Sequence, residues 1–367
     1  MSRMTPAMTL TCIAGVTIAL GACSPEPSKP AASTPAAPIT PVNAPQAAPG
    51  LSADQINSAA PTPAGLNSPA ANGAAAAPDP ALIRAEVLLD RAGFSPGVID
   101  GQAGSNEVHA LTAFQDHAQL PAGGTLDPAT WVALTKDARP VVQPYTITSE
   151  DAAGPFAPDV GEDFVKLAAQ PNGPLYASTE EALAERFHMS QPLLKALNPS
   201  ADFAKAGTQI LVAIPGAPPL AKGQVARISV SKAKEQVSAF DAGGQLLAVY
   251  PATVGSTERP SPSGRHKVRG VAWNPPYVYD PIKLNWGPRK HGKLTIKPGP
   301  KGPVGVVWID LNAPSYGLHG SPDASLIGKT ASHGCVRLTN WDALALAHGV
   351  KPGVEVDFEG ARPAARS

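Results

Sequence analysis

The most informative residues of this 367-residue chain are Ser332-His333-Gly334-Cys335-Val336-Arg337-Leu338, preceded by Tyr316-Gly317-Leu318-His319-Gly320. A thiol is nucleophilic as the thiolate, and a free cysteine is mostly protonated near neutral pH. An imidazole can take the thiol proton and return it to a leaving amine. Because His319 and His333 both lie shortly before Cys335, the pattern predicts a cysteine nucleophile with a histidine acid–base partner.

The neighbouring glycines and the arginine indicate how this nucleophile would be used. Gly320 and Gly334 allow backbone N–H groups to approach a developing oxyanion closely. The guanidinium of Arg337 can hold a carboxylate in a bidentate fork. These residues predict acyl transfer through a thioester, on a substrate that carries a carboxylate.

Two other interpretations of Cys335 are open. One is a zinc site, in which the cysteine and the two histidines would be ligands. His333 and Cys335 are only two positions apart, which is tight for tetrahedral chelation, and no fourth ligand is evident. The other is a buried, inert cysteine. We expect neither, and therefore predict no metal and no cofactor.

Residues 224–359 around this motif show the pattern of a β-rich domain. The segments with strand-like alternation or composition, separated by Gly and Pro, are residues 227–231, 235–240, 246–250, 266–273 and 304–311. One helix is expected at residues 340–348, capped by Thr339 or Asn340.

This segment resembles the L,D-transpeptidase (YkuD) catalytic domain. The resemblance rests on His319-Gly320, on the Ser332-His333-Gly334-Cys335 motif with Arg337, and on the loop Pro260-Ser261-Pro262-Ser263-Gly264. It implies that Cys335 is the nucleophile, that His319 transfers the proton and that the Gly320 carbonyl orients the His319 imidazole. The residues implied to position the substrate and shape the oxyanion site are Ser332, His333, Gly334, Arg337 and Gly320.

The resemblance also implies a substrate, the stem peptide of peptidoglycan. Cys335 would attack the bond between a diaminopimelate-type third residue (L centre) and D-Ala at position four. The acyl group would then pass to a second stem, giving a 3-3 cross-link, to a lysine of an envelope protein, to a free D-amino acid or to water. The alternatives are an L,D-carboxypeptidase and a wall-binding anchor without catalysis.

Residues 80–137 resemble the peptidoglycan-binding domain, a small three-helix module. The matching features are a leading apolar helix, the turn Gly93-Phe94-Ser95-Pro96-Gly97-Val98-Ile99-Asp100-Gly101, the run Ala110-Leu111-Thr112-Ala113-Phe114-Gln115 and the ending Asp127-Pro128-Ala129-Thr130-Trp131. Asp127 as cap with Pro128 at the first helical position predicts the third helix. The resemblance implies glycan binding, and a structural helical spacer is the alternative.

Residues 145–216 resemble part of a LysM-like module. A capping box at Ser178-Thr179-Glu180-Glu181 predicts one helix, and Leu193, Leu194 and Leu197 predict a second that ends at Asn198-Pro199. A short strand is expected at residues 210–215. Glycan binding and a purely structural role are both open for this segment. The fold class expected for the chain is multidomain α+β.

The N-terminus is typical of an exported lipoprotein. Residues 1–22 have a basic start and a short apolar run, which predicts a signal peptide. Leu20-Gly21-Ala22-Cys23 resembles the bacterial lipobox, so Cys23 would carry the lipid and Cys335 would be the only free thiol of the mature chain. The alternative is an ordinary signal peptide with a chance cysteine. We expect a periplasm-facing envelope protein, with the outer membrane favoured by Ser24 if the host is diderm.

Residues 23–79 are rich in Pro and Ala, nearly uncharged and without aromatic residues. Such a segment buries too little apolar area to offset its ordering entropy, so we expect a disordered, semi-stiff linker. The whole chain has 29 Lys and Arg and 29 Asp and Glu, giving a net charge of zero. A nucleic-acid binder needs a basic surplus, so we expect none as a partner.

Overall fold

A computed structural model describes residues 50–61, 77–217, 219–282, 284, 287 and 289–360. The predicted signal peptide, Cys23 and residues 23–49 and 62–76 of the predicted linker lie outside these residues. All described residues belong to one unit of the chain, residues 47–367. Within the described residues, no helix is long and apolar enough to cross a membrane.

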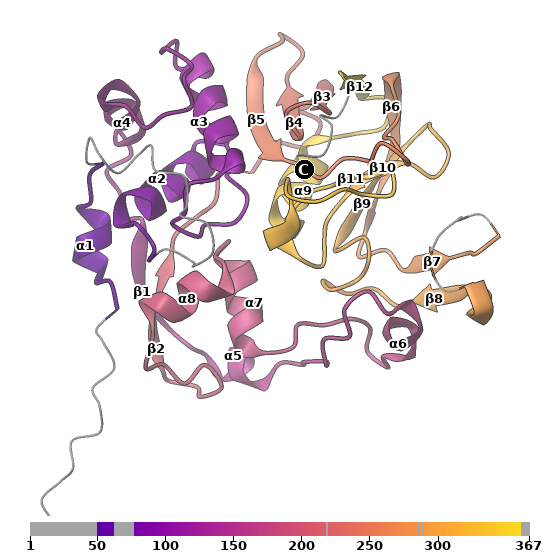
Figure 1. Ribbon diagram of the computed structural model, residues 1–367, viewed down its shortest axis with the longest axis horizontal. Helices are drawn as coiled ribbons and strands as arrows, with labels where there is room; N and C mark the ends of the chain where they lie inside the picture. Colours follow the sequence, from indigo (N-terminus) through magenta and orange to yellow (C-terminus); the bar gives the residue numbers. More distant parts are fainter. Residues whose placement is uncertain are drawn as a thin grey trace, which may run out of the picture. The chain divides into compact units, whose positions relative to one another are not determined.

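An eight-stranded sheet forms the centre of the C-terminal half (Figure 1). Its strand order is β11-β10-β9-β6-β12-β3-β4-β5, with β11 and β5 at the two edges. In chain order, the strands are β3 (Arg227–Ser231), β4 (Gln236–Phe240), β5 (Leu246–Pro251), β6 (Gly264–Trp273), β9 (Val307–Leu311), β10 (Gly317–His319), β11 (Val336–Arg337) and β12 (Glu355–Glu359). The pairs β10–β11 and β12–β3 are parallel, and the others are antiparallel.

The alternation of the sequence explains how this sheet packs. Ile228 and Val230 of β3 are fully buried, while the alternate residues Arg227, Ser229 and Ser231 are partly exposed, as a period of two requires. The helix α9 (Asn340–Gly349) packs its apolar residues into the same core as these strands. Its N-cap is Thr339, whose hydroxyl accepts a hydrogen bond from the Asp342 amide.

The first helical region contains the three predicted helices. They are α2 (Pro80–Arg91), α3 (Ser105–His117) and α4 (Pro128–Leu134). The side chain of Asp127 accepts a hydrogen bond from the Thr130 amide, and Pro128 is the first helical residue, as predicted.

The region after it has the order strand, helices, strand. Its elements are β1 (Val142–Thr146), α5 (Ser149–Ala153), α6 (Phe164–Ala169), α7 (Thr179–Arg186), α8 (Gln191–Leu197) and β2 (Gln209–Ala213). The helices α7 and α8 and the strand β2 were predicted, whereas α5, α6 and β1, which pairs antiparallel with β2, were not. Pro144 in the middle of β1 has no N–H to donate to the ladder, which makes this strand hard to predict from the sequence. Together with the sheet domain, these regions confirm the multidomain α+β class.

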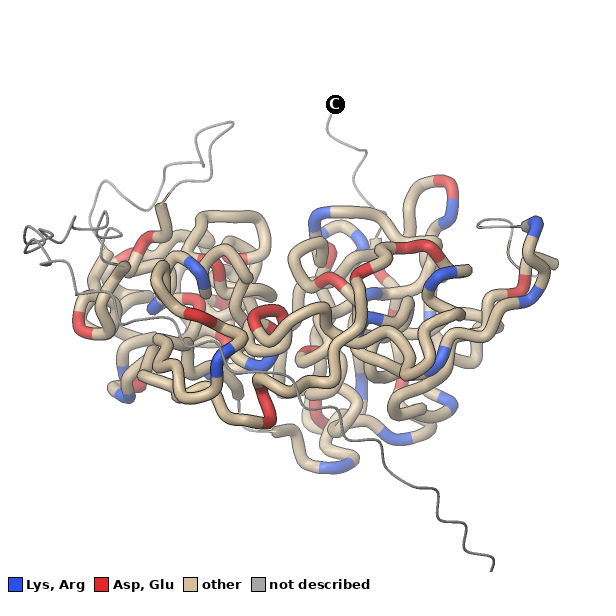
Figure 2. Tube along the Cα trace, turned by 90° about the horizontal axis from the view of Figure 1, so that it is seen from below, with Lys and Arg blue, Asp and Glu red and all other residues tan. Residues whose placement is uncertain are grey.

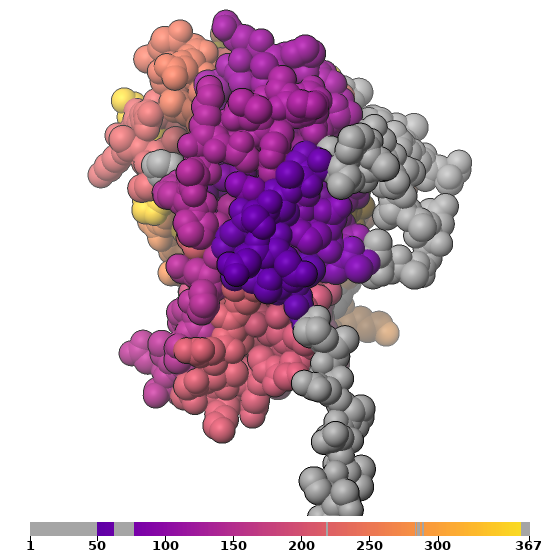
Figure 3. All heavy atoms as spheres, turned by 90° about the vertical axis from the view of Figure 1, so that its left-hand side faces the viewer, coloured from indigo at the N-terminus to yellow at the C-terminus, as the bar shows by residue number. Residues whose placement is uncertain are grey.

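The expectation of a disordered linker over residues 23–79 is wrong for residues 50–61. A short helix, α1 (Ala53–Asn57), begins at a complete capping box between Ser52 and Gln55. Ile56 is fully buried in the core that the two middle regions share, and the Asn57 side chain bonds the backbone of Val142. Figure 3 shows this segment lying against the surface of the helical region.

The helical region also contacts the large sheet. The predicted turn after α2 adds backbone hydrogen bonds to the outer edge of β5, from Ser95 N to Val249 O (2.9 Å) and from Val249 N to Gly93 O (2.8 Å). The Ser95 hydroxyl donates to the Asp342 carboxylate of α9 at 3.0 Å. The sequence motif of the predicted glycan-binding module therefore also serves as an attachment to the sheet.

A separate hairpin and two short 3-10 turns complete the C-terminal half. The hairpin is formed by β7 (Tyr277–Tyr279) and β8 (Leu294–Ile296), and the turns are η1 (Arg289–His291) and η2 (Ala324–Leu326). Basic and acidic residues are interspersed along the described chain rather than gathered in one stripe (Figure 2).

Candidate active site

Cys335 lies on the turn that leads into β11 and is partly exposed. Its Sγ is 3.5 Å from the carbonyl oxygen of Ser315. Burial raises the pKa of this thiol to about 11, although a backbone hydrogen bond from Gly317 and the Arg337 cation both favour the thiolate. At neutral pH the cysteine is therefore a neutral thiol that needs a base.

His319 ends β10 and is almost completely buried. Its Nδ1–H donates to the carbonyl oxygen of Gly320 at 2.7 Å, which leaves the lone pair on Nε2. The imidazole stacks on the Trp308 ring, with 5.3 Å between ring centroids and 19° between planes. Burial, followed by the Arg337 cation, lowers the pKa of His319 to about 3, so the imidazole is neutral at rest.

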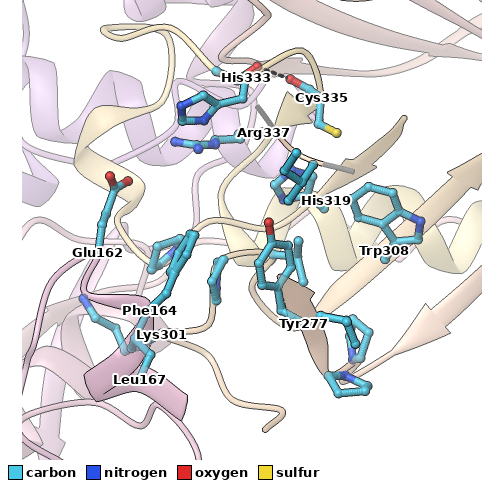
Figure 4. A pocket seen from close by; sticks show the side chains of 18 of the residues that line it. Glu162, Phe164, Leu167, Tyr277, Lys301, Trp308, His319, His333, Cys335 and Arg337 are labelled. Carbon is cyan, nitrogen blue, oxygen red and sulfur yellow. Dashed lines mark hydrogen bonds between the residues drawn. The ribbon is translucent and has the colours of Figure 1, made fainter. Parts of the chain in front are cut away.

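The register of β10 and β11 brings the predicted residues together. His319 is paired with Arg337 on these parallel strands, and both side chains line the same cavity as Cys335. Trp308 lies opposite His319 on the neighbouring strand β9. Figure 4 shows His319 and Arg337 on the side of the cavity where Cys335 lies.

Two of the predicted oxyanion residues hold the cysteine turn in shape. The Ser332 hydroxyl donates to the Cys335 carbonyl and accepts from the Gly334 amide. The Gly334 N–H is thus engaged by the Ser332 hydroxyl within the turn, and the roles of both residues toward a substrate stay predictions. Gly334 has a φ of +121°, and a Cβ there would lie 2.8 Å from the Tyr316 ring. The turn therefore requires a glycine for its conformation.

A second serine, for which no role was predicted, supports the same turn. Ser261 belongs to the quoted Pro-Ser-Pro-Ser-Gly loop and is 3% exposed. Its hydroxyl donates to the Gly334 carbonyl at 2.7 Å and accepts from the Gly255 amide at 2.9 Å. The loop thus links the residue before Cys335 to Gly255, in the segment that follows β5.

His333 differs from His319 in its surroundings. It is exposed, although it also lines the cavity. Burial of the ring and the Arg337 and Arg259 cations lower its pKa, against the opposing charge of Glu162. Within the described residues, no group of three or more His, Cys, Asp or Glu side chains could hold a metal ion.

The cavity has a volume of about 400 Å³. One wall comes from β10, β11 and the hairpin residue Tyr277, and another comes from the segment that contains α6, through Glu162, Phe164 and Leu167 (Figure 4). Sequence reasoning missed this second wall, because its residues lie more than 150 positions before Cys335. A partial signal was available in the paired apolar residues of α6.

Comparison with known proteins supports the two resemblances. Residues 226–357 match the L,D-transpeptidase catalytic domain family, YkuD, and residues 78–134 match the family described as "Putative peptidoglycan binding domain". A "Putative L,D-transpeptidase YkuD" from Bacillus licheniformis is 44% identical over 62 residues, which are 17% of this chain and 38% of the relative. The protein of the same name from Bacillus subtilis is 26% identical over 179 residues, which are 48% of this chain and 92% of the relative.

Solved structures with detectable similarity include two further proteins. L,D-transpeptidase 3 from Mycobacterium tuberculosis gives a TM-score of 0.31 at 16% identity, covering 43% of this chain and 66% of that chain. An L,D-transpeptidase (Yku) from Stackebrandtia nassauensis gives 0.29 at 15% identity, covering 81% and 98%. From the family matches and the motif, residues 226–357 are an L,D-transpeptidase catalytic domain of the YkuD family, and residues 78–134 are a peptidoglycan-binding domain.

Proposed function

We propose that this protein is a cell-wall L,D-transpeptidase that acts on tetrapeptide stems of peptidoglycan. The observation that carries the proposal is the meeting of Cys335, His319 and Arg337 at one cavity, on two paired strands and the turn between them. A nucleophile, a neutral base and a fixed cation are the groups that acyl transfer on a carboxylate-bearing peptide needs.

The first step forms a thioester. The Cys335 Sγ attacks the carbonyl carbon of the third stem residue while His319 Nε2 takes the thiol proton. When the peptide bond breaks, the same nitrogen gives that proton to the nitrogen of D-Ala, which leaves as a neutral amine. Because both side chains are neutral at rest, the proton moves as the S–C bond forms, rather than from a standing thiolate–imidazolium pair.

The tetrahedral oxyanion needs donors, and the backbone of the cysteine itself offers one. In the second step an amine attacks the thioester carbonyl, its proton passes to His319, and the sulfur leaves and is reprotonated. The acceptor would be a second stem, an envelope-protein lysine or a D-amino acid, and water would give a carboxypeptidase reaction instead.

The remaining modules would hold the enzyme at the wall. The peptidoglycan-binding domain would bind glycan, and the LysM-like region (residues 145–216) would assist it or act as a support. A lipid on Cys23 would anchor the chain in the cell envelope facing the periplasm, in the outer membrane if the host is diderm. The predicted linker between Cys23 and the first described residues would supply the reach that such an arrangement needs.

The test is mass spectrometry of muropeptides after incubation of the purified protein with tetrapeptide-rich sacculi. We expect release of D-Ala and new 3-3 cross-links with wild-type protein and none with Cys335→Ala. Tripeptide without cross-links would favour the L,D-carboxypeptidase. Binding to sacculi without any muropeptide change in the wild type would favour the non-catalytic anchor. A carbapenem should add its mass to the wild type and leave Cys335→Ala unmodified.

A further inference from the structure

The segment between α5 and α7 reaches from the LysM-like region to the catalytic cavity. It contains α6, whose Phe164 and Leu167 are buried against Tyr279 and Ile296 of the β7–β8 hairpin. These four residues form a small core separate from the two larger ones. A segment of one module is thereby built into the wall of another module's site.

Several polar contacts fix this segment beside the hairpin. Lys301, which follows the hairpin, donates its amide N–H to the Pro174 carbonyl of the segment at 3.1 Å. Its ammonium donates to the Glu181 carboxylate of α7, the helix that follows the segment, at 2.6 Å. The Lys297 ammonium donates to the Pro171 carbonyl at 2.7 Å. Apolar and polar contacts together thus hold the segment beside the hairpin and the cavity.

The segment contributes one carboxylate to the cavity, that of Glu162, which is exposed. Its carboxylate points away from Lys301 and toward the end of the cavity where His333 and Arg337 lie (Figure 4). The Glu162 charge also raises the pKa of the His333 imidazole, against burial and the Arg337 and Arg259 cations, which lower it. Glu162 and Arg337 each also line a second, smaller cavity of about 180 Å³ that adjoins the first.

The other charged residues of the larger cavity are already engaged. Lys301 is paired with Glu181, and the Asp280 carboxylate accepts from the Ile282 amide in a turn. In the described part of the chain, neither Glu162 nor Arg337 makes an ion pair. Among the residues that the structure describes, Glu162 is thus an anion of the cavity and Arg337 a cation of the cavity without an ion-pair partner, while Asp280 keeps its negative charge within a turn. This combination complements an ammonium and a carboxylate that share one carbon.

We propose that Glu162 binds the ammonium of such an α-amino acid group of the substrate, with Arg337 holding its carboxylate. The inference rests on the proposed function, since a diaminopimelate-type residue carries this group at the free end of its side chain. A free D-amino acid that acts as acceptor carries it too. Glu162 is therefore a specificity-determining residue supplied from outside the catalytic domain.

The first experiment measures binding by calorimetry in the full chain carrying Cys335→Ala, so it does not require turnover. The ligands are two tetrapeptides that differ only in whether the side-chain amine of the third residue is free or acetylated. We expect the free amine to bind more tightly and Glu162→Gln to reduce that preference by about tenfold, the loss of a charge-assisted hydrogen bond. Glu162→Asp should retain part of it. Glu150→Gln makes the same charge change on α5, at a residue that lines neither cavity, and should retain all of it.

The second experiment separates the two sources of the ammonium. With Cys335 intact, the ratio of D-methionine exchange to tripeptide formation is compared between Glu162→Gln and Glu150→Gln. A lowered binding preference assigns Glu162 to the donor stem, and a lowered exchange ratio assigns it to the acceptor. If both quantities are the same in the two variants, the inference is wrong. Absence of D-Ala release by wild-type protein would instead overturn the proposed function, and leave the binding result to stand by itself.

Discussion

His319 and Arg337 are register partners on the parallel strands β10 and β11. A permanent cation therefore lies beside a buried imidazole, and both effects disfavour the imidazolium. The same cation favours ionisation of the Cys335 thiol, but burial of the sulfur dominates. The arrangement holds the proton on sulfur and the base free until a substrate arrives.

The rate of Cys335 acylation should therefore depend little on pH across the usual range. His319, with a pKa of about 3, remains neutral, and Cys335, with a pKa of about 11, remains a thiol. Stopped-flow acylation by a carbapenem should give a nearly flat profile between about pH 5 and about pH 9, apart from hydrolysis of the reagent. A rise centred near the ordinary pKa of histidine or of cysteine would contradict this assignment.

The Ser261 hydroxyl should matter for both stability and rate. Ser261→Ala leaves the buried Gly334 carbonyl and Gly255 amide without their shared partner, so we expect a loss of about 1–3 kcal/mol in the free energy of unfolding. The looser cysteine turn should also lower kcat for D-Ala release. Urea unfolding and turnover would be compared with Ser325→Ala, whose hydroxyl is exposed. Equal behaviour of the two variants would count against a supporting role for Ser261.

The buried contact between α9 and the helical region should weaken as pH rises. Burial, and then Asp90, raises the pKa of Asp342 from 3.8 to about 7, and burial raises the pKa of nearby Glu185 to about 7 as well. When a carboxyl group has a higher pKa in the folded protein than in the unfolded chain, its contribution to stability is complete at pH values below the unfolded-state pKa. For Asp342, that contribution is lost as the pH rises through about 7.

We therefore expect the free energy of unfolding to fall by more than about 1 kcal/mol between about pH 5 and about pH 8. Asp342→Asn has no charge to bury and should show a shallower decline, measured by urea unfolding at several pH values. An identical slope for wild type and variant would show that Asp342 does not titrate in this window.

Ile56 tests whether residues 50–61 belong to the folded unit. Ile56→Ala removes a fully buried side chain and should cost about 2–5 kcal/mol in unfolding free energy. The matched variant Asp54→Asn changes an exposed position of the same short helix and should cost much less. If both variants are as stable as the wild type, residues 50–61 do not belong to the folded unit and are part of the linker.

The sequence predicted the elements whose signals are local. The cysteine motif, the Asp127-Pro128 helix start and the strand at Arg227–Ser231 each carry their information within a few residues. The strand β12 also carries a local signal, the alternation of buried Val354, Val356 and Phe358.

Other features depended on partners far away in the chain. Phe164 and Leu167 are a short apolar pair in the sequence. Their role in a core depends on contact with Tyr279 and Ile296, more than 100 residues later. The engagement of Gly334 by Ser332, only two residues away, depends instead on the shape of one turn, which composition does not encode. Specificity at this site was therefore less predictable than the identity of its nucleophile.

The catalytic domain depends on residues outside it for one wall of its cavity and for the cover of the β5 edge. We therefore expect it to behave poorly when it is produced alone. A recombinant fragment that starts at residue 224 would lose the Gly93–Ser95 backbone that covers β5 and the α6 residues that cover β7 and β8. An uncovered strand edge invites pairing with another chain, and an uncovered apolar hairpin invites association. Truncation should thus yield self-associating material, and dissection of this enzyme is better done by point substitution within the intact polypeptide.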